Sequence, residues 1–161
     1  MRRALIFLAG MASVAALASA AANAGTVEVK FTKPETYADV RDNTMRRDEV
    51  LATFSDHLKK LGSRLPEAQT LQIEVLDIDL AGETWPRSSR DIRVLRGRAD
   101  WPRIKLSYTL REGERVQRSG EEQLSDMNYM MSSMHLASGP YAYEMRMLDR
   151  WFEDRILGSK Q

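Results

Sequence analysis

The sequence has 161 residues, with 24 Lys and Arg against 23 Asp and Glu, and its net charge of +1 gives no reason to expect a nucleic acid as partner. It contains no cysteine. Disulfides, thiolate catalysis, cysteine-based zinc or iron–sulfur sites and the lipid-attachment cysteine of a bacterial lipoprotein are therefore excluded.

Residues 1–24 have the three parts of a cleavable signal peptide. Two arginines at positions 2 and 3 precede an uncharged apolar run over residues 4–21, and Ala22-Asn23-Ala24 forms a small-x-small cleavage site. The alternative is an N-terminal membrane anchor, but the run is rich in alanine rather than leucine. We therefore expect export to a bacterial periplasm, cleavage near Ala24, and a single soluble domain over 25–161 that does not span a membrane.

The first half of this domain predicts a strand, a helix and a bulged strand. Alternating apolar residues predict a strand over 26–32, and apolar residues at helical spacing predict an amphipathic helix over 44–61. In the next strand, over 71–80, the apolar parity changes between Val75 and Leu76. A β-bulge at this point would turn the following aspartates to the solvent face; the alternative is a strand whose second half is covered on its other face.

The second half predicts three strands and a helix. Ile92–Leu95 is a short strand, and the alternation over 104–110 with its return over 115–124 predicts a β-hairpin. Gly120 in the returning strand indicates a bulge or a close contact. A last helix is expected over 140–156. The fold class is therefore α+β, a mostly antiparallel sheet of four to five strands with two helices packed on one face, in the order β-α-β-β-β-β-α.

Five segments carry a family resemblance: LDIDLAGE at 76–83, RVLRG at 93–97, DWPRI at 100–104, LSDMNY at 124–129 and YEMRMLDRWF at 143–152. In this order, and over nearly the whole domain, they resemble a family of small exported proteobacterial proteins known as a domain of unknown function. The resemblance implies a single exported domain. It implies no activity and no catalytic residue.

Asp77, Asp79 and Glu83 form the densest carboxylate cluster. If the bulge turns both aspartates outward, they lie about 7 Å apart on one strand face. Such a cluster suits a divalent cation such as calcium, or the acid/base chemistry of a hydrolase-like enzyme. The alternative is that these acids pair with nearby arginines and cap the following loop.

A methionine-rich stretch is the most unusual local pattern; it consists of Met127, Met130, Met131, Met134 and His135. On a helix these positions would share one face. Thioethers and imidazole are soft ligands that suit Cu(I). The alternative is packing, because methionine fills irregular gaps in a core.

Basic residues are concentrated over residues 87–118, which hold nine Arg and one Lys against four acids. Arg103 and Lys105 on one strand and Arg115 on its partner predict a basic sheet face for an anionic envelope component or an acidic protein. The alternative is a solvated face with cross-strand pairs to Glu112, Glu114 and Glu121.

Two Trp-Pro pairs, at Trp85 and Trp101, either cover the edge of the core or anchor a partner. Only two histidines are present and no Gly-x-Ser-x-Gly elbow occurs, so a hydrolase triad is not expected, and His57 is interpreted as a surface or boundary residue.

The sequence therefore predicts no reaction and no cofactor. Its best interpretation is a non-enzymatic soluble periplasmic domain that binds a protein partner or an anionic envelope component. The alternatives are a copper or divalent-cation binding protein and a hydrolase-like enzyme built on the carboxylate cluster. The ligand and the oligomeric state stay open.

Overall fold

The computed structural model describes residues 24–40, 44–85, 92–97, 99–131 and 139–158. Their strands and helices are, in chain order, β1 (Thr26–Phe31), α1 (Thr44–Leu61), β2 (Gln69–Asp79), β3 (Glu83–Trp85), β4 (Ile92–Val94), β5 (Arg103–Glu112), β6 (Arg115–Ser125) and α2 (Ala142–Trp151), which continues as a π-helical turn over Phe152–Leu157. Short 3-10 turns cover Pro34–Thr36 and Gly62–Arg64. The predicted signal peptide lies outside the described residues, apart from Ala24.

Four strands form the main sheet in the order β1-β2-β5-β6. β1 runs parallel to β2, because α1 carries the chain back to the starting edge, and the other neighbours are antiparallel. β3 and β4 form a separate two-stranded ribbon. The α+β class and its mostly antiparallel sheet are confirmed; β3 is an additional strand that the sequence did not indicate.

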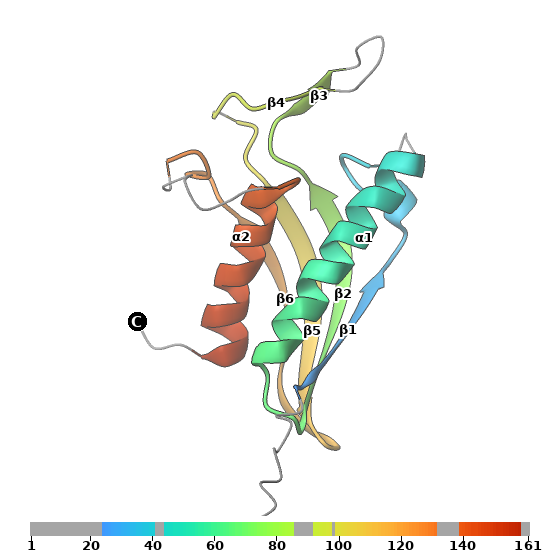
Figure 1. Cartoon of the computed structure of the whole chain (residues 1–161), viewed down its shortest axis with the longest axis vertical. Helices are drawn as coiled ribbons and strands as arrows, with labels where there is room; N and C mark the ends of the chain where they lie inside the picture. Colours follow the sequence, from blue (N-terminus) through green and yellow to red (C-terminus); the bar gives the residue numbers. More distant parts are fainter. Residues whose placement is uncertain (1–23, 41–43, 86–91, 98, 132–138, 159–161) are drawn as a thin grey trace, which may run out of the picture.

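Both helices lie on one face of the sheet, and the opposite face is left open (Figure 1). α1 buries Val50, Phe54 and Leu58 against the sheet, as its helical spacing predicted. α2 buries Leu148 and Trp151 beside them. Trp151 meets Tyr108 of β5 edge to face, with ring centroids 5.5 Å apart. The core therefore occupies one layer between helices and sheet.

The predicted bulge in β2 is confirmed. The register with β5 shifts between Val75 and Asp77, so Leu76 is the extra residue. Val75 and Ile78 are both buried on the helix side, whereas Asp77 and Asp79 face the open side opposite Lys105 and Arg103. The apolar parity of the sequence thus reports a real change in strand geometry.

A second bulge lies in β6, where the register with β5 shifts between Leu110 and Arg111. It leaves Gln117 unpaired and does not involve Gly120. Gly120 instead marks a close contact, because a Cβ there would lie 3.3 Å from Cε1 of Tyr108. One of the two readings of Gly120 is therefore confirmed.

The two helices are joined by His57 of α1 and Asp149 of α2, whose Nε2 and Oδ1 atoms lie 2.7 Å apart. His57 is half-buried and forms part of this interhelical contact. None of the helices in the described part of the chain has the length and apolar content that crossing a membrane requires.

Candidate interaction surfaces

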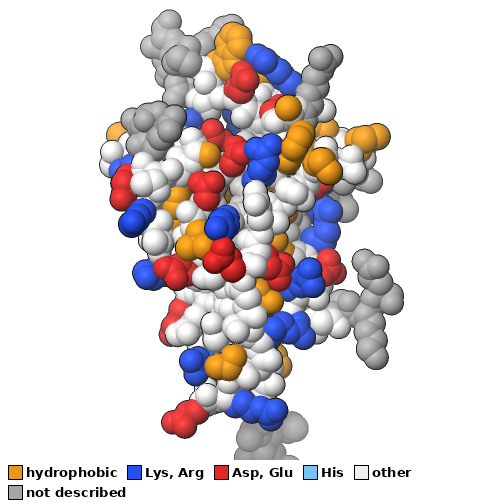
Figure 2. Space-filling view, turned by 180° about the vertical axis from the view of Figure 1, so that it is seen from behind, with side chains coloured by type: hydrophobic (Ala, Val, Ile, Leu, Met, Phe, Trp, Pro, Cys, Tyr) orange, Lys and Arg blue, Asp and Glu red, His pale blue; other side chains and the backbone are white. Residues whose placement is uncertain are grey.

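The open face of the sheet carries charges of both signs (Figure 2). Arg103 Nη1 lies 2.5 Å from Oδ2 of Asp79. Lys105 Nζ lies 2.9 Å from Oε1 of Glu121. The structure therefore places Arg103 and Lys105 on this face, as expected, but pairs each with a carboxylate. Arg115 is exposed at the turn of the β5–β6 hairpin, in register with Glu112.

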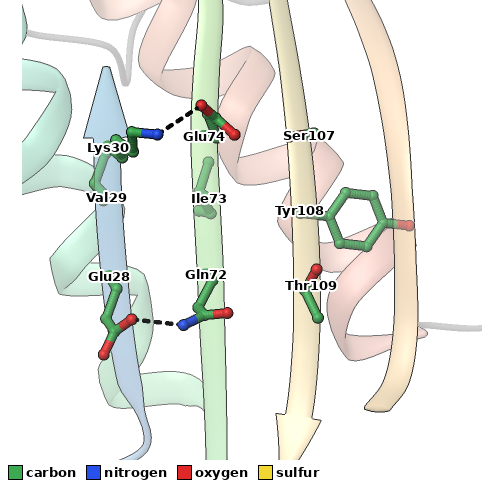
Figure 3. Close-up of a pocket in the computed structure, with 9 residues that line it drawn as sticks. All are labelled: Glu28, Val29, Lys30, Gln72, Ile73, Glu74, Ser107, Tyr108 and Thr109. Carbon is green, nitrogen blue, oxygen red and sulfur yellow. Dashed lines mark hydrogen bonds and ion pairs between the residues drawn. The ribbon is translucent and has the colours of Figure 1, made fainter. Parts of the chain in front are cut away.

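A shallow hollow of about 310 Å³ lies on this face over the middle of the sheet (Figure 3). Short side chains of β5, Ser107 and Thr109, border it on one side. Two cross-strand pairs border it on the other: Lys30 Nζ lies 3.0 Å from Glu74 Oε1, and Gln72 donates to Glu28 over 2.9 Å.

The Glu74 carboxylate in this wall has a lowered pKa because the Thr32 hydroxyl and the Lys30 ammonium both donate to it. The ionised Glu74 carboxylate is therefore neutralised by Lys30 and hydrogen-bonded by Thr32. Glu28 accepts from the neutral amide of Gln72, so the described residues of the hollow offer one exposed carboxylate and no cluster of charges of one sign.

Each acid of the carboxylate cluster has a different partner within the protein. Asp77 Oδ1 accepts from the backbone N–H of Ala38 at 3.0 Å, and Asp79 pairs with Arg103. Glu83 lies 3.3 Å from Arg96 Nη2. Across the ranges that the structure describes, no three His, Asp or Glu side chains converge as metal ligands would. The geometry agrees with the alternative in which these acids pair with arginines and tie down a loop.

The methionine stretch is only partly described. Met127, Met130 and Met131 lie in turns after β6, and their exposed fractions are 66%, 42% and 85%. Met134 and His135 lie outside the described residues, so the Cu(I) site stays a prediction. The three described thioethers are not core residues, although Met130 lies against Gly97.

The β3–β4 ribbon extends from the helix-covered sheet at the end where β2 finishes (Figure 1). Trp85 and Ile92 are directly opposite one another in it, and 51% and 43% of their areas are exposed. The Arg96 guanidinium lies over the Trp85 ring at 5.6 Å. Gly97 follows, and a Cβ there would lie 2.7 Å from the Met130 sulfur.

These contacts join the ribbon to the methionine turns. The Gly97 N–H also donates to the Tyr129 hydroxyl over 3.1 Å. We call the exposed residues of these two segments the ribbon surface; it consists of Trp85, Ile92, Arg96, Met127, Met130 and Met131. Its exposed members are mainly the large apolar side chains that normally avoid water.

A buried ion pair attaches the ribbon to the body of the protein. Glu144 in the first turn of α2 is fully buried, and its Oε1 accepts from the backbone N–H of Ala81 at 2.8 Å and from Arg93 of β4. Arg93 also donates through Nε to the Ala81 carbonyl oxygen. Ala81 lies two residues before β3, so one carboxylate attaches both strands of the ribbon.

The two Trp-Pro pairs have different roles. Trp101 is half-buried against a small second core of Ala81, Tyr129 and Tyr143, and Arg103 stacks on it at 4.7 Å. It covers a core edge. Trp85 is half exposed, and its Nε1 donates to Oε2 of Glu83 over 3.2 Å.

Sequence reasoning did not identify Arg93 and Glu144 as a pair. Both lie within segments that carried the family resemblance, at 93–97 and 143–152. A glutamate at the third position of a helix is ordinary by itself, because it stabilises the helix N-terminus. Only its complete burial distinguishes it.

Comparison with known proteins gives one match. A family model described as "Protein of unknown function (DUF3016)" matches residues 25–154. No curated protein and no solved structure matches the chain.

Proposed function

The chain belongs to the DUF3016 family, and from this premise we propose that it is an exported, non-enzymatic domain that binds a protein partner through the ribbon surface. The observation that carries the proposal is the exposure of Trp85 and Ile92 on a ribbon that a buried ion pair holds in place. An apolar surface on a fixed scaffold needs little ordering when it binds, which favours affinity.

The composition of the ribbon surface suits a protein. Tryptophan, methionine and arginine are the residue types enriched at the centres of protein interfaces. The three methionines add flexible, polarisable side chains that adapt to a partner. Arg96 lies between Trp85 and Glu83, so the surface also offers a polar rim.

An anionic membrane is the less suitable occupant. Glu83, with 57% of its side chain exposed, borders the surface and pairs with Arg96, so it offsets the positive charge that Arg96 would offer to anionic head groups. The open sheet face is also less suitable, because its basic side chains are paired with acids. A protein that offers an apolar pocket with polar groups around it meets neither difficulty.

Export is supported by the signal-peptide pattern and by the start of the family match at Gly25, directly after the expected cleavage site. The test is fractionation of cells followed by N-terminal sequencing. We expect the periplasmic form to begin at Gly25. An uncleaved chain in the cytoplasm would contradict the export part of the proposal.

Partner binding is tested by photo-crosslinking in cells, with the crosslinking amino acid placed at Met131 on the ribbon surface or at Gln72 on the open sheet face. We expect a discrete protein adduct from position 131 and none from position 72. The partner identified by mass spectrometry is then purified. Trp85→Ala should weaken its binding at least about tenfold, and Gln72→Ala should leave it unchanged.

Three results would overturn the proposal: an adduct from position 72 alone, equal binding by the Trp85→Ala variant, or an adduct that consists of lipid. Flotation with phosphatidylglycerol-containing vesicles checks the last case directly. Trp85-dependent flotation would assign the surface to a membrane instead.

A further inference from the structure

β6 is a long edge of the main sheet, and no other described strand pairs with its outer side. It pairs with β5 on one side only and is the outermost strand on the side away from β1 (Figure 3). Residues 115–121 are all exposed. Such an edge presents a row of backbone N–H and C=O groups that can pair with another strand.

The charges along β6 are arranged symmetrically about Gly120. Arg118 lies two residues before this glycine and Glu122 two residues after it. Both side chains lie on the helix side of the sheet, because they are in register with the buried residues Leu110 and Leu106 of β5. Arg118 has no ion-pair partner in the described part of the chain, although the strand around it is rich in charge.

We propose that β6 pairs antiparallel with β6 of a second copy of this chain, with the two Gly120 residues opposite each other across a two-fold axis. In this register each Arg118 lies opposite Glu122 of the second copy, and Ser119 lies opposite Glu121 of that copy. Opposite residues of an antiparallel pair share one face, so both ion pairs form on the helix side. The product is one continuous eight-stranded sheet with a closed two-fold interface.

Neighbouring registers are less favourable. A shift of the axis to Glu121 or Glu122 puts two glutamates opposite each other, and a shift to Arg118 does the same with two arginines. A shift to Ser119 puts Arg118 opposite Gly120 and removes the ion pairs. Like charges directly opposite one another destabilise a sheet, so the sequence of β6 selects the Gly120 register.

The local packing also suits this register. Gly120 has no side chain, and the Tyr108 ring of β5 lies against it, so β6 itself brings no side chain to the axis. Glu122 is partly held by Arg155, whose Nε lies 3.4 Å from its Oε2. The Tyr108 hydroxyl donates to Oε1 of Glu122 over 3.4 Å, so the carboxylate is held on the helix side of β6 before a second copy arrives. A single strand edge is a small interface, so we expect a dimer that depends on concentration.

The test is a charge exchange followed by sedimentation velocity of the purified protein over about a hundredfold range of concentration. Arg118→Glu and Glu122→Arg should each remain monomeric where the unchanged chain dimerises. A mixture of the two variants should dimerise again, because every opposed pair is then complementary. Circular dichroism melting of each variant shows whether it is folded. The mixture is a second control, because misfolded variants would not regain dimerisation when they are combined.

The register is checked by disulfide trapping, which is clean because the chain has no cysteine of its own. Ser119→Cys mixed with Glu121→Cys should form an intermolecular disulfide under mild oxidation. Ser119→Cys mixed with Ser125→Cys is the out-of-register control and should form none. A monomer at all concentrations, a mixture that does not dimerise, or equal trapping in both mixtures would overturn the proposal. None of these results bears on the ribbon surface.

Discussion

The Tyr37 hydroxyl donates a hydrogen bond to the carbonyl oxygen of Val75 over 2.6 Å, at the residue where β2 bulges. The same carbonyl accepts from the backbone N–H of Thr32 at 3.0 Å. The segment after β1 is thereby tied to the bulge that turns Asp77 and Asp79 to the open face. Burial raises the pKa of Tyr37 to about 12.

Tyr37→Phe should lower the free energy of unfolding by about 1 kcal/mol at neutral pH, because it removes one buried hydrogen bond. The folded chain holds the Tyr37 proton above pH 10.0, where the unfolded chain releases it, so this contribution is lost as pH rises toward about 12. Urea denaturation at pH 7 and in this alkaline window measures both effects. The variant should lose less stability across this window than the unchanged chain, because a phenylalanine ring has no proton to release. Some loss remains, because the pKa values of Tyr108, Tyr129 and Tyr141 are also raised. An equal loss in both proteins would contradict the assignment.

Asp39 should weaken the fold as pH rises. Burial raises its pKa above the ordinary 3.8, so the folded chain binds this proton more tightly than the unfolded chain does. The stability that protonation adds is complete below the ordinary pKa and is lost as pH rises through the raised pKa. In the folded chain the Leu80 N–H donates to Oδ2 of Asp39 over 2.7 Å. Asp39→Asn removes the pH dependence of stability that Asp39 causes, and its amide oxygen can still accept this hydrogen bond.

The measurement for Asp39 is the difference in unfolding free energy between the unchanged chain and Asp39→Asn. As pH falls toward about 3.8, the unchanged chain should gain unfolding free energy relative to Asp39→Asn. Glu35→Gln, at an exposed carboxylate of the same segment, is the matched control. A difference that is constant with pH would show that Asp39 titrates normally.

Glu144→Gln should destabilise the protein by about 3 kcal/mol, because it leaves Arg93 without a counter-charge in a largely buried position. Arg93→Met combined with Glu144→Gln should recover much of this loss, since no unpaired charge then remains and the amide oxygen still accepts from Ala81. Thermal denaturation gives the stabilities. Hydrogen exchange over residues 81–85 and 92–97 should report loosening of the ribbon in the single variant. A double variant that is less stable than either single variant would contradict this role.

Calcium should not bind at Asp77, Asp79 and Glu83. Each of these carboxylates is already committed to a different protein donor, and a cation would have to displace Arg103 from Asp79. Calorimetric titration with millimolar calcium should therefore give only the heat of dilution. A saturable heat that disappears in Asp79→Ala would contradict the expectation and restore the cation hypothesis.

Local pattern was sufficient for most elements of the fold. The spacing of Val50, Phe54 and Leu58 predicted α1, and the parity change after Val75 predicted the bulge in β2, which the structure confirms. These predictions succeed because a helix or strand with one buried face imposes its own period on the sequence. β3 escaped prediction because its three residues, Glu83-Thr84-Trp85, contain a single apolar side chain and so show no alternation.

The candidate surfaces depended on contacts between distant segments. The amino-acid pattern was enough to predict the α+β class, the faces of the strands and a leader-like segment with its expectation of export. The pairing of Arg103 and Lys105 with acids, the covering of Trp101 but not Trp85, and the contact of Glu144 with Arg93 became visible in the folded chain. Periodicity shows which face of an element a residue occupies. Which charge or ring lies opposite it is set by register and packing between elements far apart in the chain.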